Sequence, residues 1–251
     1  MAPTLVFLHH FGGSARSWDA VIAELGGAFE TVALDLPGFG DAAGAPGPYT
    51  VAAMADDVEA RLRALGCTSF VLVGHSMGGK VALAFAARQP VGLRSLVLLA
   101  PSPPTPEPIA EDERATFIAG WAEYSTASRI LASATSLPLS DDARRLAIGD
   151  IMRTGKAAWT AWLACGSRED ISAHLRSVEV PATLLSGTCD TVLPTALIAR
   201  EVAGRLSHAR IVTLPGAGHL LPLEAPEAAA QMISRTAADA NVGDTHARRA
   251  A

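Results

Sequence analysis

The sequence predicts an α/β fold in which helices cover both faces of a mostly parallel sheet. Over the first hundred residues, short apolar segments alternate with helix-like segments, and this alternation returns from about residue 180. The apolar segments are continuous runs, which is typical of parallel strands that are buried on both faces. The chain has 251 residues, of which 49% are hydrophobic and 18% charged, so it can bury the large core that such a sheet requires.

The elements of the first half follow from apolar periodicity and from turn residues. Trp18, Val21 and Leu25 recur at helical spacing, and Thr50 and Gly66 are suited to begin and end the next helix. The predicted strands are 4–8, 30–36, 69–74 and 93–100, and the predicted helices are 16–26, 50–65 and 77–88.

The alternation is interrupted by "PSPPTPEP" (101–108), whose five prolines in eight positions exclude a helix or a central strand. The next segment, up to residue 176, is helical in composition and holds three of the four tryptophans. An insertion explains the resumed alternation better than a linker between independent domains. The later elements are strands 180–187 and 209–216, a helix from about 194 and a helix over 222–240. We therefore expect a core of residues 1–100 and 177–240, a helical lid of residues 101–176 and a flexible tail of residues 241–251.

Charge and cysteine content exclude several classes of protein. The net charge is -5 and no long basic run occurs, which argues against nucleic acid or an anionic membrane as the partner. Cys67, Cys165 and Cys189 are odd in number and form no CxxC pair, so we expect reduced thiols in a cytoplasmic protein. Neither a signal peptide nor a membrane-spanning helix is expected, because no apolar run is long enough.

The strongest chemical signal is "GHSMGG", residues 74–79, between a predicted strand and a predicted helix. In the pattern G-x-S-x-G, small residues let the chain turn sharply and expose the serine at the N-terminus of a helix. The helix dipole favours negative charge that develops there. Ser76 is therefore a candidate nucleophile, and a glycine-rich turn with an incidental serine is the alternative.

A serine nucleophile needs a histidine base and an acid that orients the histidine, in the chain order Ser, Asp or Glu, His. His219 follows the last strand and Asp190 follows the preceding one, so both should reach the sheet edge that carries Ser76. No carboxylate precedes Glu107 in the proline run, and Asp35 precedes the serine, which favours a structural role. We expect His75 to pack beneath the serine turn, Cys189 to pack rather than react, and three histidines to lie on the surface: His174, His208 and His246.

Five motifs together resemble the α/β-hydrolase superfamily over nearly the whole chain outside residues 101–176. They are "FLHHFGGSARSW", "LDLPGFGD", "GHSMGG", "SGTCDTVLP" and "GAGHLLPLEAPE". The resemblance is strongest to small bacterial esterases, enol-lactonases and cofactor-free perhydrolases that carry a helical lid. It implies an eight-stranded, mostly parallel sheet whose N-terminal antiparallel strands are short or missing here, and it implies no cofactor.

The adjacent His9 and His10 suggest a metal site or a base, but no third ligand is apparent, and we expect no metal. The resemblance instead implies that this loop supplies one backbone N–H to an oxyanion hole, at Phe11, while Met77 supplies the other. His10 stands where the family pattern has glycine and can reach the substrate pocket. Four further pocket candidates, which can equally pack the lid onto the core, are Trp121, Tyr124, Trp159 and Trp162.

The sequence thus predicts a serine hydrolase acting on a small to medium, fairly apolar carboxylic ester. Residues 101–176 hold no dense cluster of Arg or Lys, which disfavours a highly anionic substrate. The alternatives are an enol-lactone or C–C bond hydrolase, a cofactor-free perhydrolase, and a ligand receptor without activity. A monomer and a dimer are both compatible with the sequence.

Overall fold

A six-stranded sheet forms the centre of the computed structural model, which describes residues 2–247. Its strand order is β2-β1-β3-β4-β5-β6, and every pair of neighbours within these residues is parallel. Central strands β1, β3 and β5 are buried along their whole length, whereas edge strands β2 and β6 are partly exposed. The strands are β1 (Thr4–Leu8), β2 (Thr31–Leu34), β3 (Phe70–His75), β4 (Leu93–Leu99), β5 (Ala182–Gly187) and β6 (Ala209–Leu214).

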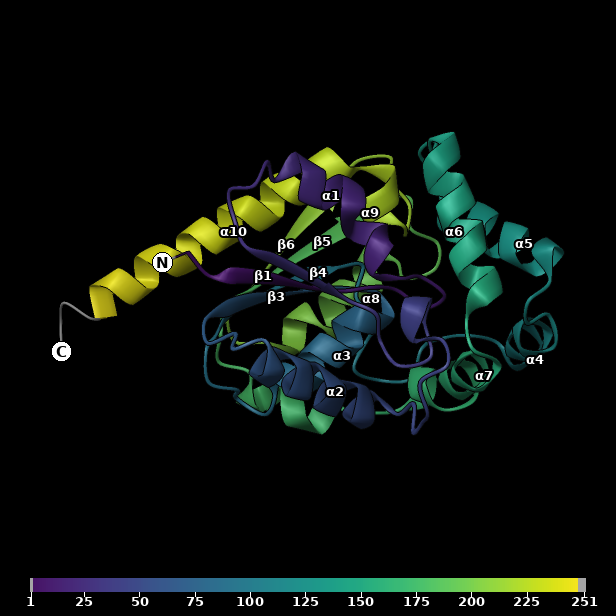
Figure 1. Ribbon diagram of the computed structural model, residues 1–251, viewed down its shortest axis with the longest axis horizontal. Helices are drawn as coiled ribbons and strands as arrows, with labels where there is room; N and C mark the ends of the chain where they lie inside the picture. Colours follow the sequence, from purple (N-terminus) through teal and green to yellow (C-terminus); the bar gives the residue numbers. More distant parts are fainter. Residues whose placement is uncertain (1, 248–251) are drawn as a thin grey trace.

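Helices form a layer on each face of the sheet, as the sequence predicts. Figure 1 shows α1 and α10 on one side of the sheet and α2, α3 and α8 on the other. Thr50 accepts the N-cap hydrogen bond of α2, and Gly66 has a φ of 65° just after its end. The helices of these layers are α1 (Asp19–Glu24), α2 (Val51–Ala64), α3 (Met77–Ala86), α8 (Thr195–Glu201), α9 (Leu221–Glu224) and α10 (Pro226–Ala247).

Two predicted helices differ from the observed ones. The segment 16–26 begins as a 3₁₀ turn, Ala15–Trp18, before α1. The segment 222–240 is divided into α9 and α10, because Pro226 lacks a backbone N–H and can only begin a helix. Helix α10 continues to Ala247 and includes most of the segment 241–251, for which a tail is expected; residues 248–251 lie outside the described part.

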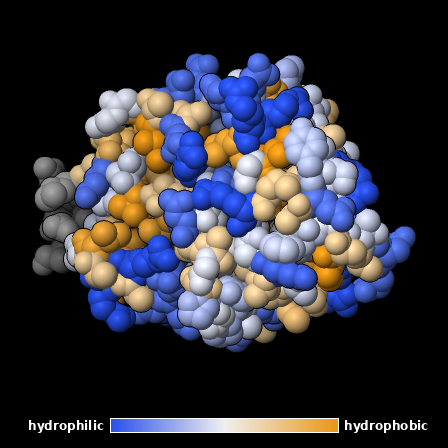
Figure 2. Space-filling model, turned by 45° about the vertical axis from the view of Figure 1, so that its right-hand side comes forward, coloured by the Kyte–Doolittle hydropathy of each residue, from blue (hydrophilic) through white to orange (hydrophobic). Residues whose placement is uncertain are grey.

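Between β4 and β5, residues 101–176 form an inserted segment that lies beside the end of the sheet, at the right of Figure 1. Figure 2 brings this side forward and shows apolar surface in separate patches among hydrophilic side chains. None of the helices within residues 2–247 has the length and apolar character needed to cross a membrane. The inserted helices are α4 (Glu111–Ala119), α5 (Tyr124–Ala134), α6 (Asp141–Arg153) and α7 (Lys156–Ala164).

The sheet topology decides where functional side chains can meet. The chain leaves β1 towards β2 on one side and returns to β3 on the other, so the carboxyl ends of β1 and β3 flank a crevice. The loop after β1 and the serine turn after β3 are therefore neighbours. The loops after β5 and β6 reach the same edge of the sheet, because all strands run in the same direction.

Candidate active site

The serine turn, residues 74–78, joins β3 to α3 in a strained conformation. Ser76 has a φ of 52° and a ψ of -117°, which a non-glycine residue rarely adopts. Gly78 must be small, because a Cβ atom there would lie 2.5 Å from the backbone oxygen of Leu8. This close approach also lets the Gly78 N–H donate to the His9 carbonyl at 3.1 Å. The turn therefore holds the loop after β1 directly against the serine.

Ser76, His219 and Asp190 form one chain of hydrogen bonds. The Ser76 Oγ lies 2.9 Å from His219 Nε2, and His219 Nδ1 lies 2.8 Å from Asp190 Oδ2. A carboxylate can only accept here, so Nδ1 carries the proton and Nε2 is left to accept the serine proton. Asp190 is itself held by the N–H groups of Val192 and Leu193, which both donate to its Oδ1 at 2.8 Å. All three side chains are largely shielded from water.

The loop 9–14 after β1 contains the two adjacent histidines, and they have different environments. The Leu36 N–H donates to His9 Nε2 at 3.0 Å, so the His9 proton is on Nδ1, which donates to the His10 carbonyl at 2.7 Å. Burial lowers the pKa of His9 and lowers that of His10 to about 3. Both rings are therefore neutral near neutral pH, and His9 is a structural support of the loop.

Two backbone N–H groups belong to the segments that meet at Ser76. They belong to Phe11, in the loop 9–14, and to Met77, the first residue of α3. Neither donates to a backbone or side-chain acceptor within residues 2–247. Free N–H groups beside a nucleophile are suited to bind an oxygen that becomes negatively charged. These are the two donors that the resemblance implies for the oxyanion hole.

Two hydrogen bonds to the backbone of His219 fix its position. The His75 Nε2–H donates to the His219 carbonyl at 2.8 Å, and the His219 N–H donates to the Ala134 carbonyl, also at 2.8 Å. His75 is fully buried beneath the turn, as expected, and burial lowers its pKa well below the usual value. Ala134 ends α5, so the inserted segment contacts the catalytic candidate directly.

Glu224 is a buried carboxylate that the sequence analysis did not identify. Its Oε2 accepts from the N–H groups of Ser136, Leu137 and Gly218 at 2.8–2.9 Å, and its Oε1 accepts from the Leu220 N–H at 3.0 Å. One carboxylate thus joins the residues on both sides of His219 to the loop between α5 and α6. The only signal in the sequence was an acidic residue five positions after His219 in an otherwise apolar segment.

A cavity of about 260 Å³ opens in front of Ser76 and His219. Its wall is mostly apolar and comes largely from the inserted segment, through Ile109, Phe117 and Trp162. Besides Ser76 and His219, its polar lining consists of His10, Glu107, Glu113, Ser133 and Thr191.

Only two of the five predicted pocket residues line this cavity: His10 and Trp162. The prediction is wrong for Trp121, Tyr124 and Trp159. Tyr124 is 65% exposed, whereas the indole N–H groups of Trp121 and Trp159 donate at 2.8 Å to backbone carbonyls of the inserted segment. Trp159 packs behind Phe11, with ring centroids 4.6 Å apart, so it supports the wall instead of forming it. Helical periodicity indicates that an aromatic residue is buried, but not which side it faces.

Other candidates from the sequence have structural or surface positions. Asp35 accepts from the N–H groups of Ala15 and Asp41, which confirms a structural role. Among the described residues, no group of three or more His, Cys, Asp or Glu side chains is arranged to hold a metal ion. His174 and His208 are exposed, as predicted, and the side chain of His246 lies outside the described part. Cys189 is also exposed, so its predicted packing role is wrong.

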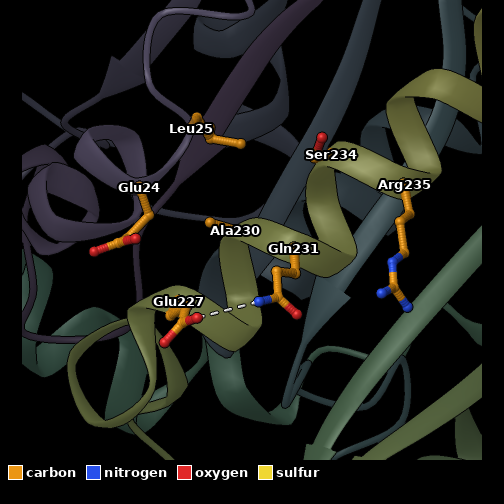
Figure 3. A pocket seen from close by; sticks show the side chains of 7 residues that line it. All are labelled: Glu24, Leu25, Glu227, Ala230, Gln231, Ser234 and Arg235. Carbon is orange, nitrogen blue, oxygen red and sulfur yellow. Dashed lines mark hydrogen bonds between the residues drawn. The ribbon is translucent and has the colours of Figure 1, made fainter.

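A second cavity, of about 320 Å³, lies between α1 and α10, away from Ser76 (Figure 3). It is lined by Glu24, Leu25 and one face of α10, where Glu227 and Gln231 form a hydrogen bond of 3.3 Å. Its lining contains neither a nucleophile with a base nor a buried charge. It therefore offers no chemistry comparable with that of the first cavity.

Comparisons with known proteins find similar proteins over most of the chain. A family model described as "Alpha/beta hydrolase family" matches residues 5–232. The putative carbamate hydrolase RutD of Klebsiella pneumoniae (strain 342) is 29% identical over 228 residues, which cover 87% of this chain and 85% of the relative. The 2-succinyl-6-hydroxy-2,4-cyclohexadiene-1-carboxylate synthase of Enterobacter sp. (strain 638) is 29% identical over 248 residues, which cover 93% and 91%.

Solved structures of the same architecture include a thermophilic esterase from Thermogutta terrifontis. It superposes with a TM-score of 0.82 at 26% sequence identity, and the match covers 96% of this chain and 91% of the esterase. The similarity therefore extends over the sheet, its helical layers and the inserted segment.

Proposed function

Because the chain is a hydrolase that belongs to the alpha/beta hydrolase family, we propose that it cleaves carboxylic esters through an acyl-enzyme on Ser76. The observation that carries the proposal is the continuous hydrogen-bonded chain from Ser76 through His219 to Asp190. The esterase of similar structure from Thermogutta terrifontis supports an ester as the substrate. Residues 101–176 act as a lid in this proposal, since they supply most of the cavity wall.

In the first half of the reaction, Ser76 Oγ attacks the ester carbonyl carbon while His219 Nε2 takes the hydroxyl proton. Asp190 keeps the proton on Nδ1 and stabilises the imidazolium that forms. The carbonyl oxygen becomes negatively charged and accepts hydrogen bonds from the N–H groups of Phe11 and Met77. The C–O bond then breaks, and the departing alkoxide takes the proton from Nε2.

In the second half, a water molecule attacks the acyl-enzyme while His219 Nε2 takes one of its protons. The tetrahedral intermediate collapses, the carboxylic acid leaves and the proton returns to Ser76 Oγ. Glu107 is not the acid of this system, although it follows β4 and lines the cavity. His219 Nδ1 contacts Asp190 instead.

A carbamate is the second candidate substrate, because curated relatives over most of the chain are named putative carbamate hydrolases. The same serine would attack the carbamoyl carbon. The enzyme would then carry a carbamoyl group instead of an acyl group, or the leaving group would be an amine instead of an alcohol. Among the predicted alternatives, lactone opening and C–C bond cleavage also use this serine chemistry.

The test is burst kinetics with p-nitrophenyl acetate, followed by a panel of p-nitrophenyl esters of rising acyl length, an aryl carbamate, a lactone and a β-diketone. We expect a burst of one nitrophenol per active site and its loss in Ser76→Ala. Equal hydrolysis by wild type and Ser76→Ala would refute the proposed mechanism. Turnover of the carbamate without turnover of the esters would instead favour the second candidate.

A further inference from the structure

Glu107 is the one carboxylate that is anchored by hydrogen bonds in the wall of the cavity in front of Ser76. Its Oε1 accepts from the Ser102 Oγ at 2.5 Å, and its backbone N–H donates to the Ser167 carbonyl at 2.8 Å. Ser102 in turn donates its backbone N–H to the Ser76 carbonyl at 2.9 Å. Glu107 therefore has a fixed position relative to the nucleophile, although it belongs to the inserted segment.

The second carboxylate oxygen, Oε2, is available to a ligand. It takes part in no hydrogen bond within residues 2–247, and it is not among the buried atoms that lack a partner, so it is accessible. The cavity that it borders is otherwise mostly apolar. An acceptor in such a wall has to be matched by a donor on the ligand, since an unmatched buried acceptor weakens binding.

The charges around Glu107 favour a neutral donor over a cation. Lys80 is fully buried and donates to the Thr105 carbonyl at 3.3 Å, while Arg114 is buried and donates to the Leu163 carbonyl and to the Ser167 hydroxyl. Burial raises the pKa of Glu107 above its usual value, and the hydrogen bond from Ser102 and the positive charges of Lys80 and Arg114 counteract this only in part. When Glu107 is ionised, the positive charges of Lys80 and Arg114 offset its negative charge.

The remaining polar groups of the lining do not take this role. His10 is held neutral by burial and lies beside the oxyanion donors, while Glu113 is exposed. The hydroxyl groups of Ser133, in α5, and of Thr191, in the loop after β5, both donate to backbone carbonyls. Glu107 alone combines a fixed carboxylate, an accessible oxygen and compensating cations.

We propose that Glu107 forms a polar subsite in which its free oxygen accepts a hydrogen bond from a neutral hydroxyl or N–H group on the substrate, away from the scissile carbonyl. This inference rests on the proposed function and sharpens it. The substrate is an ester whose chain is largely apolar but carries one neutral donor. Esters with a carboxylate at that place are rejected, because they would bring a second negative charge to Glu107.

The experiment compares methyl heptanoate with methyl hexanoates that carry a hydroxyl, ammonium or carboxylate group at the end of the acyl chain. A second series consists of acetate esters whose alcohol part carries the same end groups. Hydrolysis is followed by proton release, so no chromophore disturbs the subsite. We expect the hydroxyl compound to exceed methyl heptanoate in kcat/KM by about tenfold, the scale of one hydrogen bond to a charged group. Glu107→Leu should abolish that preference, and Glu107→Gln, which retains an acceptor, should keep part of it.

Glu113→Leu is the matched control, because it removes a carboxylate from the same cavity at an exposed position; the hydroxyl preference should persist. The deciding quantity is the ratio of kcat/KM for the hydroxyl ester to kcat/KM for methyl heptanoate. If this ratio in Glu107→Leu stays within twofold of the wild-type ratio, the proposed subsite is wrong. If the wild type prefers the ammonium ester to the hydroxyl ester, the proposal that the subsite selects a neutral donor is wrong.

Calorimetric binding of the hydroxyl and methyl compounds to Ser76→Ala, with and without Glu107→Leu, separates this inference from the proposed function. That readout needs no turnover. If no ester is hydrolysed but the binding preference depends on Glu107, the subsite stands and the ester mechanism fails. If esters are hydrolysed but neither hydrolysis nor binding depends on Glu107, the ester mechanism stands and the subsite fails.

Discussion

Replacing Glu224 by glutamine should destabilise the protein and reduce its activity together, because one carboxylate satisfies four backbone N–H groups around His219. A glutamine amide has one acceptor oxygen. With that oxygen at the position of Oε2, three of the bonds remain, and the amide NH₂ faces the N–H of Leu220. Two donors then confront each other in a buried place.

The size of the loss follows from these four bonds. The Leu220 N–H loses its bond to Glu224 and keeps only the longer one to the Ala134 carbonyl at 3.3 Å, which costs about 1 kcal/mol. The three remaining bonds change from charge-assisted to neutral, which weakens each by roughly half. Together these terms give a loss of about 3 kcal/mol or more in the free energy of unfolding, a large part of the ~5–15 kcal/mol typical of a domain.

The assay is urea unfolding followed by circular dichroism, beside kcat and KM for p-nitrophenyl acetate. We expect a lower urea midpoint and a fall in kcat larger than any change in KM, since Gly218 and Leu220 flank His219. Glu227→Gln is the matched control, because Glu227 is exposed and bonds only to Gln231 at 3.3 Å. If Glu224→Gln and Glu227→Gln unfold at the same urea concentration, the positioning role assigned to Glu224 is wrong.

Three further predictions concern the serine turn, the acid and the buried histidines. Gly78→Ala should abolish soluble expression or lower the melting temperature strongly, because its Cβ would lie 2.5 Å from the Leu8 backbone oxygen; an unchanged melting temperature contradicts this. Asp190→Asn should keep the fold but lower kcat by about 10³–10⁴, since the amide favours the wrong His219 tautomer; a loss below tenfold would argue against Asp190 as the acid. Burial lowers the folded pKa of His10 to about 3, below the unfolded value of about 6.5, so the unfolded chain gains a proton that the folded chain does not. Stability should therefore fall as the pH drops below about 6.5, by about 1.4 kcal/mol per pH unit for each such histidine, and urea midpoints of His10→Gln should depend less steeply on pH between about 6 and 4 than those of wild type.

The sequence alone predicts the alternation of strands and helices and the order of the candidate catalytic residues. Short continuous apolar runs between turn residues are typical of strands buried on both faces, and parallel strands bring their following loops to one edge of the sheet. For this reason Ser76, Asp190 and His219 could be selected as candidates from the sequence. Asp190 follows Ser76 by 114 positions, and His219 follows Asp190 by 29. The division of residues 222–240 at Pro226 was not predicted, although proline cannot continue a helix.

Only the tertiary structure decides what faces the cavity. Within the inserted segment, packing directions depend on how four short helices lean on one another, so periodicity could not separate Trp162, which lines the cavity, from Trp159, which packs behind Phe11. The environment of His9 likewise depends on a partner that is distant in the chain. The Leu36 N–H, in the loop after β2, donates to His9, and the sequence does not predict this contact. Hydrogen-bond partners that are far apart in the chain, such as those of Glu224, become neighbours only through the fold. The sequence therefore determined which residues can perform the chemistry, and the structure decided which ones surround the substrate.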